Sequence, residues 1–274
     1  MSHILINGET KETISVFDRG LQYGDGLFET MAFRDGKIPL WDLHWERLSQ
    51  GCEQLSISLP EKELLENEIN LLCNDEDENQ FIIKLVITRG VGERGYHYSG
   101  RQNVTRILSS HPLPGYPMSY QSHGVAVRYC DTTLSENKKL AGIKHLNRLE
   151  QVLARNEWDT DEYQEGLMLS TRGYIIDGTM SNIFAVKDND VFTPDLSLCG
   201  VSGVMRKTVI NLSKVLGFSV YEKTFTKCEL EDADEVFLTN SLFGIWPVKK
   251  IAKTQYTKVG AVTQQLQEEL KKIR

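Results

Sequence analysis

The chain has 274 residues, a net charge of −7 at pH 7 and 40% hydrophobic residues. This is the composition of a globular protein with enough apolar material for a core, and it excludes a disordered, collagenous or low-complexity chain. The acidic balance argues against nucleic acid or an anionic membrane surface as the main partner.

The N-terminal residues contain no basic segment followed by an apolar stretch, so the sequence predicts no secretory signal. No apolar run is long enough to cross a bilayer. The histidines are widely spaced, and the cysteines are odd in number and contain no CxxC pair. We therefore expect a cytoplasmic protein with reduced thiols and without a metal centre. The cysteines are Cys52, Cys73, Cys130, Cys199 and Cys228.

The N-terminal part of the chain is predicted to form short strands, two amphipathic helices and a further strand. Turns are expected at Asn7-Gly8 and Asp35-Gly36, because such dipeptides favour tight hairpins. The two helices show apolar residues at spacings of three and four. The expected strands are Ser2–Asn7, Glu12–Phe17, Leu27–Arg34 and Phe81–Arg89, and the expected helices are Leu40–Ile57 and Glu61–Cys73.

Proline marks the boundary between two parts of the chain. Three of the seven prolines lie within His111–Tyr120, a segment that can sustain neither a helix nor a central strand. We expect an N-terminal domain of residues 1–113, a linker of residues 114–122 and a C-terminal domain of residues 123–274.

The C-terminal part mixes strands and helices without strict alternation. This disfavours a doubly wound parallel sheet and predicts the α+β class, with two mixed domains. The expected strands are Gly124–Cys130, Leu167–Ser170, Tyr174–Asp177, Asn182–Val186, Val191–Thr193, Phe218–Lys223 and Glu235–Leu238, and the expected helices are Leu146–Trp158, Gly203–Leu216 and Val259–Ile273.

Three local features could carry chemistry. The turn of residues 200–203 precedes a predicted helix, whose N-terminus suits a phosphate, although Ser202 as a simple helix cap is the commoner case. His44 and Arg47 lie three apart on a predicted helix, and a guanidinium suits phosphate, although such arginines are usually only solvated. Lys144 could form a Schiff base or act as a base, but spacing alone does not separate it from surface lysines.

Longer motifs extend over nearly the whole chain, from Ile6-Asn7-Gly8 to about Lys249. They are Val16-Phe17-Asp18-Arg19-Gly20, Tyr23-Gly24-Asp25-Gly26-Leu27-Phe28-Glu29-Thr30, His44-Trp45-Glu46-Arg47-Leu48, Arg94-Gly95-Tyr96, Gly142-Ile143-Lys144-His145-Leu146-Asn147-Arg148-Leu149-Glu150-Gln151, Asp177-Gly178-Thr179-Met180-Ser181-Asn182-Ile183-Phe184 and Gly200-Val201-Ser202-Gly203-Val204-Met205-Arg206. Together and in this order they resemble the fold-type IV pyridoxal-phosphate enzymes, the class IV aminotransferase family.

The resemblance implies a D-amino-acid aminotransferase-like fold, pyridoxal 5'-phosphate as cofactor and a homodimer with active sites near the subunit interface. It makes Lys144 the catalytic residue and the Schiff-base lysine. Arg47 would bind the cofactor phosphate. The backbone N–H groups of Val201 and Ser202 and the Ser241 hydroxyl would help it.

One position departs from the family pattern. Asp177 stands where the family usually has a Glu facing the pyridine nitrogen. A carboxylate there keeps the ring nitrogen protonated, so that the ring can accept electrons. Asp supplies the same charge on a side chain one methylene shorter, and an ordinary turn Asp before Gly178 is the alternative reading.

Within the family, the segment after Lys144 resembles the lyases, since Leu149 replaces the Tyr that branched-chain aminotransferases usually carry. Arg94-Gly95-Tyr96 also resembles the lyases. The implied reaction converts 4-amino-4-deoxychorismate, a small dicarboxylate, to 4-aminobenzoate and pyruvate in folate biosynthesis. The implied substrate contacts are Thr30, Lys84, Arg94, Tyr96 and Asn240.

Two alternatives stay open. The chain could be a D-amino-acid or branched-chain aminotransferase that uses the same fold and cofactor. It could also be a cofactor-free descendant of the family that serves as a binding or scaffold protein.

Overall fold

A computed structural model describes residues 3–74, 76, 78–98 and 103–273, which divide into two compact units. Unit 1 contains residues 1–114 and, separately, residues 143–147. Unit 2 contains residues 115–142 and 148–274. The mixture of sheets and helices confirms the predicted α+β class. Assigning Lys144 to a C-terminal domain was wrong, because residues 143–147 pair with a strand of unit 1.

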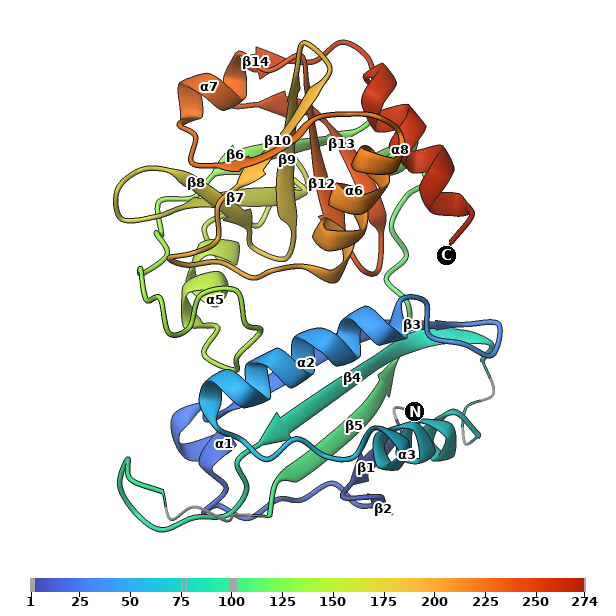
Figure 1. The fold of residues 1–274 in the computed structure, drawn as a ribbon, viewed down its shortest axis with the longest axis vertical. Helices are drawn as coiled ribbons and strands as arrows, with labels where there is room; N and C mark the ends of the chain where they lie inside the picture. The colour runs from blue at the N-terminus through green and yellow to red at the C-terminus, as the bar shows by residue number, and fades with distance from the viewer. Residues whose placement is uncertain (1–2, 75, 77, 99–102, 274) are drawn as a thin grey trace. The chain divides into compact units, whose positions relative to one another are not determined.

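Unit 1 is an antiparallel sheet covered by helices (Figure 1). The strand order is β2-β1-β5-β4-β3, helix α2 packs on β3, and α3 packs on β1 and β5. Positive φ angles at Asn7 and Gly8 form the predicted turn between β1 and β2. The elements are β1 Ile4–Ile6, β2 Glu9–Thr10, α1 Arg19–Tyr23, β3 Gly26–Arg34, α2 Trp41–Leu55, α3 Lys62–Asn74, β4 Gln80–Thr88 and β5 Thr105–His111.

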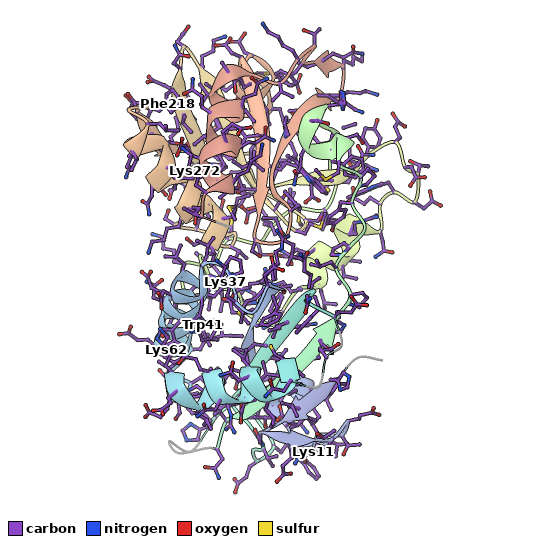
Figure 2. The ribbon with its side chains drawn as sticks, turned by 90° about the vertical axis from the view of Figure 1, so that its right-hand side faces the viewer. Lys11, Lys37, Trp41, Lys62, Phe218 and Lys272 are labelled. Atoms are coloured by element: carbon purple, nitrogen blue, oxygen red, sulfur yellow. The ribbon has the colours of Figure 1, made fainter. Side chains whose placement is uncertain are left out.

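The two long helices of unit 1 are joined at their N-terminal ends. The Trp41 indole N–H donates to Glu66 at 2.7 Å, and Lys62 donates to Asp42, also at 2.7 Å. Figure 2 labels Trp41 and Lys62, which lie at the start of α2 and α3. These polar contacts fix the ends of the helices, while their apolar faces cover the sheet.

Unit 2 is built on a large mixed sheet of order β11-β10-β9-β12-β13-β6-β7-β8, with β14 paired to β13. Helix α6 packs on β11 and β12, and α8 packs on β12, β13 and α6 (Figure 1). The elements are α4 Ser119–Ser122, β6 Val125–Tyr129, α5 Leu149–Arg155, β7 Glu165–Leu169, β8 Ile175–Gly178, β9 Asn182–Lys187, β10 Asp190–Pro194, α6 Val204–Val215, β11 Val220–Lys223, α7 Lys227–Glu231, β12 Glu235–Asn240, β13 Gly244–Ile251, β14 Thr254–Gln255 and α8 Ala261–Lys271.

Two predicted elements differ from the structure. Residues 12–17 are not a strand, and the apolar Val16 and Phe17 in this segment are exposed rather than buried. The helix expected over Leu146–Trp158 is confined to Leu149–Arg155. It starts late because the backbone before it is used in sheet-like pairing.

Helix α3 offers a test of the packing in unit 1. Leu65 is fully buried, whereas its neighbour Leu64 is 40% exposed. We expect Leu65→Ala to lower the free energy of unfolding by about 2–5 kcal/mol, because it leaves a cavity in the core. Leu64→Ala, the matched control, should cost under about 1 kcal/mol. Urea unfolding of both variants measures this, and equal losses would contradict the burial of Leu65.

Candidate functional site

Lys144 is held by its own backbone against β3. The Phe28 N–H donates to the Lys144 carbonyl and the Leu146 N–H donates to the Gly26 carbonyl, both at 3.0 Å. A Cβ at Gly26 would lie 2.8 Å from a Leu146 methyl carbon and 2.4 Å from the Ile87 carbonyl oxygen, so only glycine permits this close approach. The segment 143–147 is therefore fixed on both sides of the lysine.

The side chain of Lys144 lies over an aromatic ring on one face of β3. Its Nζ is 4.1 Å from the centroid of the Phe28 ring, and Nζ of Lys84 is 5.8 Å from the same centroid. Lys84 is paired in register with Thr30, so these two side chains share that face. Unit 1 thus brings together three residues predicted for the site, Thr30, Lys84 and Lys144, with two amines close to one ring. Such a cluster attracts carboxylates.

Arg47 is held from the opposite face of β3, where the strand meets α2. Glu29 is buried and binds the Arg47 guanidinium through both of its oxygens, one of them accepting from Nε at 2.8 Å. Nδ1 of His44 lies 2.7 Å from Glu29. Because a carboxylate can only accept, this nitrogen carries the proton. Glu29 therefore sets the plane of the guanidinium.

Opposing effects decide the charge of this cluster. Burial alone would raise the pKa of Glu29, but the charge of Arg47 and the hydrogen bonds from His44 and Arg47 lower it to about 2. Burial also lowers the pKa of His44, although Glu29 acts in the other direction. At neutral pH the cluster is an ion pair of Arg47 and Glu29 beside a neutral imidazole.

Arg94 and Tyr96 lie elsewhere in unit 1, in the exposed loop that follows β4. The Tyr96 side chain is 86% exposed. The backbone of this loop is bound to α1, since Arg19 donates to the carbonyls of Gly95 and Tyr96 at 2.8 and 3.2 Å.

Asp177 is a buried carboxyl at the end of β8 in unit 2. One oxygen accepts from the Asn182 amide and the other from the Val201 N–H, each at 2.7 Å. Burial raises the pKa of Asp177 to about 7, even though these hydrogen bonds and the charges of Arg206 and Arg148 lower it.

The glycines of the 200–203 turn are explained by this carboxyl and its partner. A Cβ at Gly200, where φ is +90°, would lie 2.8 Å from Asp177 Oδ2. A Cβ at Gly203 would lie 2.0 Å from Asn182 Oδ1. The turn is glycine-rich because two polar side chains pack directly against it.

The predicted phosphate contacts of this turn require a correction. The Val201 N–H donates to Asp177, and the Ser202 N–H donates to the Gly142 carbonyl at 2.9 Å. Both donors are used within unit 2, so the assignment of these two N–H groups to a phosphate was wrong. The sequence could not indicate this, because the partner Gly142 lies about sixty residues earlier in the chain.

Asn240 and Ser241 follow one another at the end of β12. The Asn240 amide donates to the Met180 carbonyl at 2.5 Å and accepts from the Leu242 N–H at 2.8 Å. Thr239, one residue earlier, is in register with Asn182, and its buried hydroxyl has no hydrogen-bond partner among the described residues. Unit 2 thus gathers Asp177, Val201 and Asn182 and leaves one buried hydroxyl beside them unsatisfied.

Three polar residues that support the site were not predicted. Glu29 and Asn182 hold Arg47 and Asp177, as described above. Glu165 is buried and accepts from the N–H groups of residues 166, 179 and 180 and from two hydroxyls, and so orders the turn between Asp177 and Asn182. A signal was present for Glu29, which stands among apolar residues on β3.

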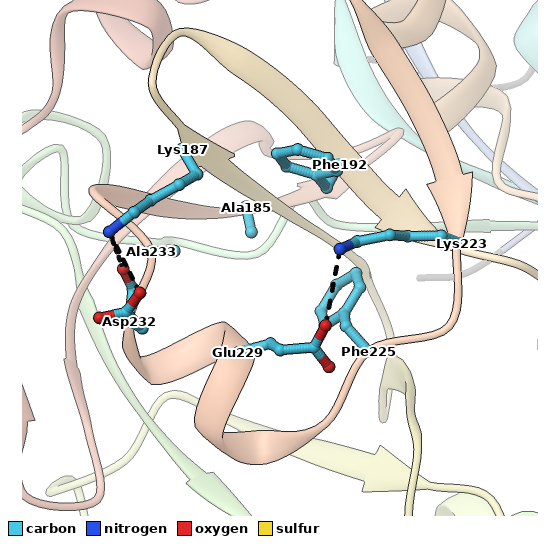
Figure 3. A pocket seen from close by; sticks show the side chains of 8 residues that line it. All are labelled: Ala185, Lys187, Phe192, Lys223, Phe225, Glu229, Asp232 and Ala233. Atoms are coloured by element: carbon cyan, nitrogen blue, oxygen red, sulfur yellow. Dashed lines mark hydrogen bonds and ion pairs between the residues drawn. The ribbon is translucent and has the colours of Figure 1, made fainter.

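A cavity of about 170 Å³ in unit 2 lies apart from these residues. Figure 3 shows two ion pairs in its lining, Lys187 with Asp232 and Lys223 with Glu229, together with apolar side chains such as Ala185 and Phe192. None of the residues predicted for the site lines it. Among the described residues no cluster of His, Cys, Asp and Glu could hold a metal, and no helix is long and apolar enough to span a membrane.

The residues present fit pyridoxal phosphate. Lys144 supplies an amine, Arg47 a guanidinium held in one plane, and Asp177 a buried carboxyl that a pyridinium would keep ionised. The unsatisfied Thr239 hydroxyl adds a donor beside Asp177 and Asn182. Unit 1 thus contains an amine and a guanidinium, and unit 2 a buried carboxyl, which are the groups that an aldehyde, a phosphate and a pyridinium nitrogen require.

Asp177 should make the stability of the apoprotein depend on pH. Between its ordinary pKa of 3.8 and about 7, the unfolded chain loses the proton that the folded chain retains, so the free energy of unfolding falls as pH rises. A pKa difference of one corresponds to about 1.4 kcal/mol. Asp177→Asn should remove this decline, as measured by urea unfolding at pH 4 to 7. The exposed Asp161→Asn is the control, and wild-type behaviour in Asp177→Asn would contradict the raised pKa.

The family description "Amino-transferase class IV" matches residues 26–251. An aminodeoxychorismate lyase of Vibrio harveyi is 38% identical over 266 residues, covering 96% of this chain and 97% of the relative. A putative branched-chain-amino-acid aminotransferase of Methanocaldococcus jannaschii is 32% identical, covering 99% and 96%.

Among solved structures, a 4-amino-4-deoxychorismate lyase from Pseudomonas aeruginosa is 42% identical and superimposes with a TM-score of 0.93, covering 98% of both chains. The family match spans both units, from the start of β3 to the end of β13. The chain belongs to the class IV aminotransferase family.

Proposed function

We propose that this protein is a pyridoxal-phosphate-dependent lyase that converts 4-amino-4-deoxychorismate to 4-aminobenzoate and pyruvate. The observation that carries the proposal is the pair of amines, Lys144 and Lys84, over the ring of Phe28. One amine can move a proton while the other remains a fixed cation for a carboxylate of the substrate. The similarity to two lyases over nearly the whole chain supports it.

Pyridoxal phosphate, when bound, supplies an aldehyde that takes up an amine and a ring that accepts electrons. In the proposal Lys144 is its covalent attachment point. Arg47 binds its phosphate with help from the Ser241 hydroxyl, and Asp177 faces its ring nitrogen. The Val201 N–H holds Asp177 in place for that role.

The proton steps fall to the amine of Lys144. Its Nζ removes the proton from C4 of the substrate, and the bond between the ring carbon and the enolpyruvyl oxygen breaks. The same Nζ then returns the proton to the methylene carbon of the departing enolpyruvyl group, which leaves as pyruvate. The ionised Asp177 favours electron flow towards a protonated ring nitrogen. Formation of the aromatic product draws the reaction forward.

The substrate is a dicarboxylate, so cations and hydroxyls should recognise it. In the proposal Lys84 and Thr30 act beside Lys144 on one face of β3. Arg94 and Tyr96 act from their exposed loop, and Asn240 acts from the end of β12 beside the exposed Met180.

We also propose a homodimer in the cytoplasm. Helix α5 exposes Leu149, Val152 and Leu153, and each is more than half exposed, as expected of a face that another chain covers. All five cysteines are free, which supports a reducing compartment.

Lys144→Ala should abolish turnover and covalent attachment of the cofactor. The measurements are formation of 4-aminobenzoate from 4-amino-4-deoxychorismate, and mass spectrometry of the peptide containing residue 144 after borohydride reduction. The exposed Lys138→Ala is the matched control and should behave as wild type. Near-normal lyase activity in Lys144→Ala would overturn the assignment.

Arg47→Lys should weaken binding of pyridoxal phosphate by roughly tenfold or more, because an ammonium cannot reproduce the planar contacts of a guanidinium. The dissociation constant follows from quenching of tryptophan fluorescence. Gln50→Ala, at an exposed position one turn later on α2, should leave it unchanged. Equal affinities of the wild type and Arg47→Lys for pyridoxal phosphate would contradict the role of Arg47 in binding the cofactor.

The aminotransferase alternatives are tested on the wild-type protein. Incubation with D-alanine, or separately with a branched-chain amino acid, plus 2-oxoglutarate should give little exchange. Incubation with 4-amino-4-deoxychorismate alone, with no added keto acid as amino acceptor, should give 4-aminobenzoate and pyruvate. The reverse pattern would select an aminotransferase, and a protein that stays colourless with the cofactor would select a non-enzymatic role.

A further inference from the structure

The motif of residues 16–25 is only partly explained by the proposed site. Its Arg19 is 3% exposed, a rare position for a guanidinium. Nε donates to Asp25 at 2.9 Å, while Nη1 and Nη2 donate to the carbonyls of Gly95 and Tyr96. Each nitrogen of this buried cation thus has an acceptor, and two of the three acceptors belong to the loop after β4.

Tyr23 holds the same loop from a second side. Its hydroxyl accepts from the Gly95 N–H at 3.1 Å, and its ring meets that of Tyr96 edge-on with centroids 5.6 Å apart. The Arg19 guanidinium also lies 4.8 Å from the centre of the Tyr23 ring. Gly95 has φ of +105°, a conformation that favours glycine. Both polar groups of its backbone are therefore bound to α1.

Helix α1, which holds this loop through Arg19 and Tyr23, is itself held by further charged and polar groups. Asp25 accepts from Arg89 through both oxygens, at 2.8 and 3.0 Å, in addition to its bond from Arg19. The buried Asp18 caps α1 and accepts from the hydroxyls of Thr88 and Thr105. The loop is thus attached to the ends of β4 and β5 through buried charges.

The side chains of this loop contrast with its backbone. Arg94 is exposed and Tyr96 is 86% exposed, although the main chain at residues 95 and 96 is fixed by three hydrogen bonds. A backbone held in place under exposed side chains is the arrangement expected of a loop that presents them to a ligand.

We propose that Arg19 and Tyr23 are positioning residues for the substrate. They fix the backbone of Gly95 and Tyr96 so that Arg94 and Tyr96 meet a carboxylate of the substrate in one geometry. This inference rests on the proposed function, in which these two side chains recognise a dicarboxylate. Neither Arg19 nor Tyr23 takes part in the chemistry.

The most specific test of this positioning is the variant Tyr23→Phe, which keeps the aromatic ring and removes only the hydroxyl that accepts from the Gly95 N–H. One hydrogen bond corresponds to about 0.5–1.5 kcal/mol, so KM for 4-amino-4-deoxychorismate should rise about two- to tenfold. The value of kcat, the absorbance spectrum of the bound cofactor and its affinity should stay unchanged. Tyr221→Phe, at a half-exposed position on β11, is the matched control.

Coupling to Arg94 separates positioning from a general loss of stability. In an Arg94→Ala background, Tyr23→Phe should raise KM less than it does in the wild type, because one of the two side chains that Tyr23 positions is gone. Arg19→Lys, which loses the forked contacts to both carbonyls, should raise KM more than Tyr23→Phe does. If Arg19→Lys does not fold, Tyr23→Phe and the double variant decide the question.

Hydrogen exchange makes the test independent of activity. In Tyr23→Phe, amides of residues 90–98 should exchange faster than in wild type, with no change in the peptide containing Lys144. Unchanged exchange in this loop overturns the inference, as does an unchanged KM or an additive double variant. Lack of lyase activity in the wild type instead contradicts the proposed function, and with it the substrate named here, whatever the exchange shows.

Discussion

The site in unit 1 depends on two main-chain hydrogen bonds that join residues 143–147 to β3. They add a short extended segment to the strand and bring Lys144 over Phe28, although more than a hundred residues separate the two in sequence. Gly26 makes the approach possible, since any side chain there would meet Leu146 and the Ile87 carbonyl. The backbone of Lys144 is therefore placed by pairing with β3 and by the absence of a side chain at Gly26.

Around this pairing, buried or partly buried carboxylates hold cationic side chains and backbone dipoles in place. Glu29 orients Arg47, Asp25 orients Arg19 and Arg89, and Glu165 orders the turn between Asp177 and Asn182. Removing a carboxylate from water is costly, and each is compensated by several donors. Asp177 is the exception, because its two hydrogen bonds do not offset burial and its pKa lies near neutrality. Among these carboxylates, the imperfectly compensated group is the one proposed to meet a cationic ring nitrogen.

The sequence was sufficient for the fold class, the family and most long elements, because apolar periodicity and ordered motifs are local signals. The β-strand over Gly244–Ile251 was not predicted, because Pro247 argues against a central strand. In the structure the strand contains this proline, and its pairing with β6 shifts register just after it, between Val248 and Lys250. The roles of Glu29 and Glu165 depend on partners distant in sequence. The N–H groups of Val201 and Ser202 were misassigned for the same reason. The Val201 N–H donates to Asp177 and the Ser202 N–H donates to the Gly142 carbonyl, and both acceptors are distant in the sequence.

The chain passes from one unit to the other three times, at residues 114–115, 142–143 and 147–148. A polypeptide that ends at residue 114 would contain the sheet, Arg47 and the loop of Arg94, yet it would lack the lysine that completes them. Unit 1 is thus not one continuous stretch of the chain, because residues 143–147 come from the later part of the sequence. Recombination between relatives would have to preserve a five-residue insertion from one half into the other, which links the evolutionary fates of the two units.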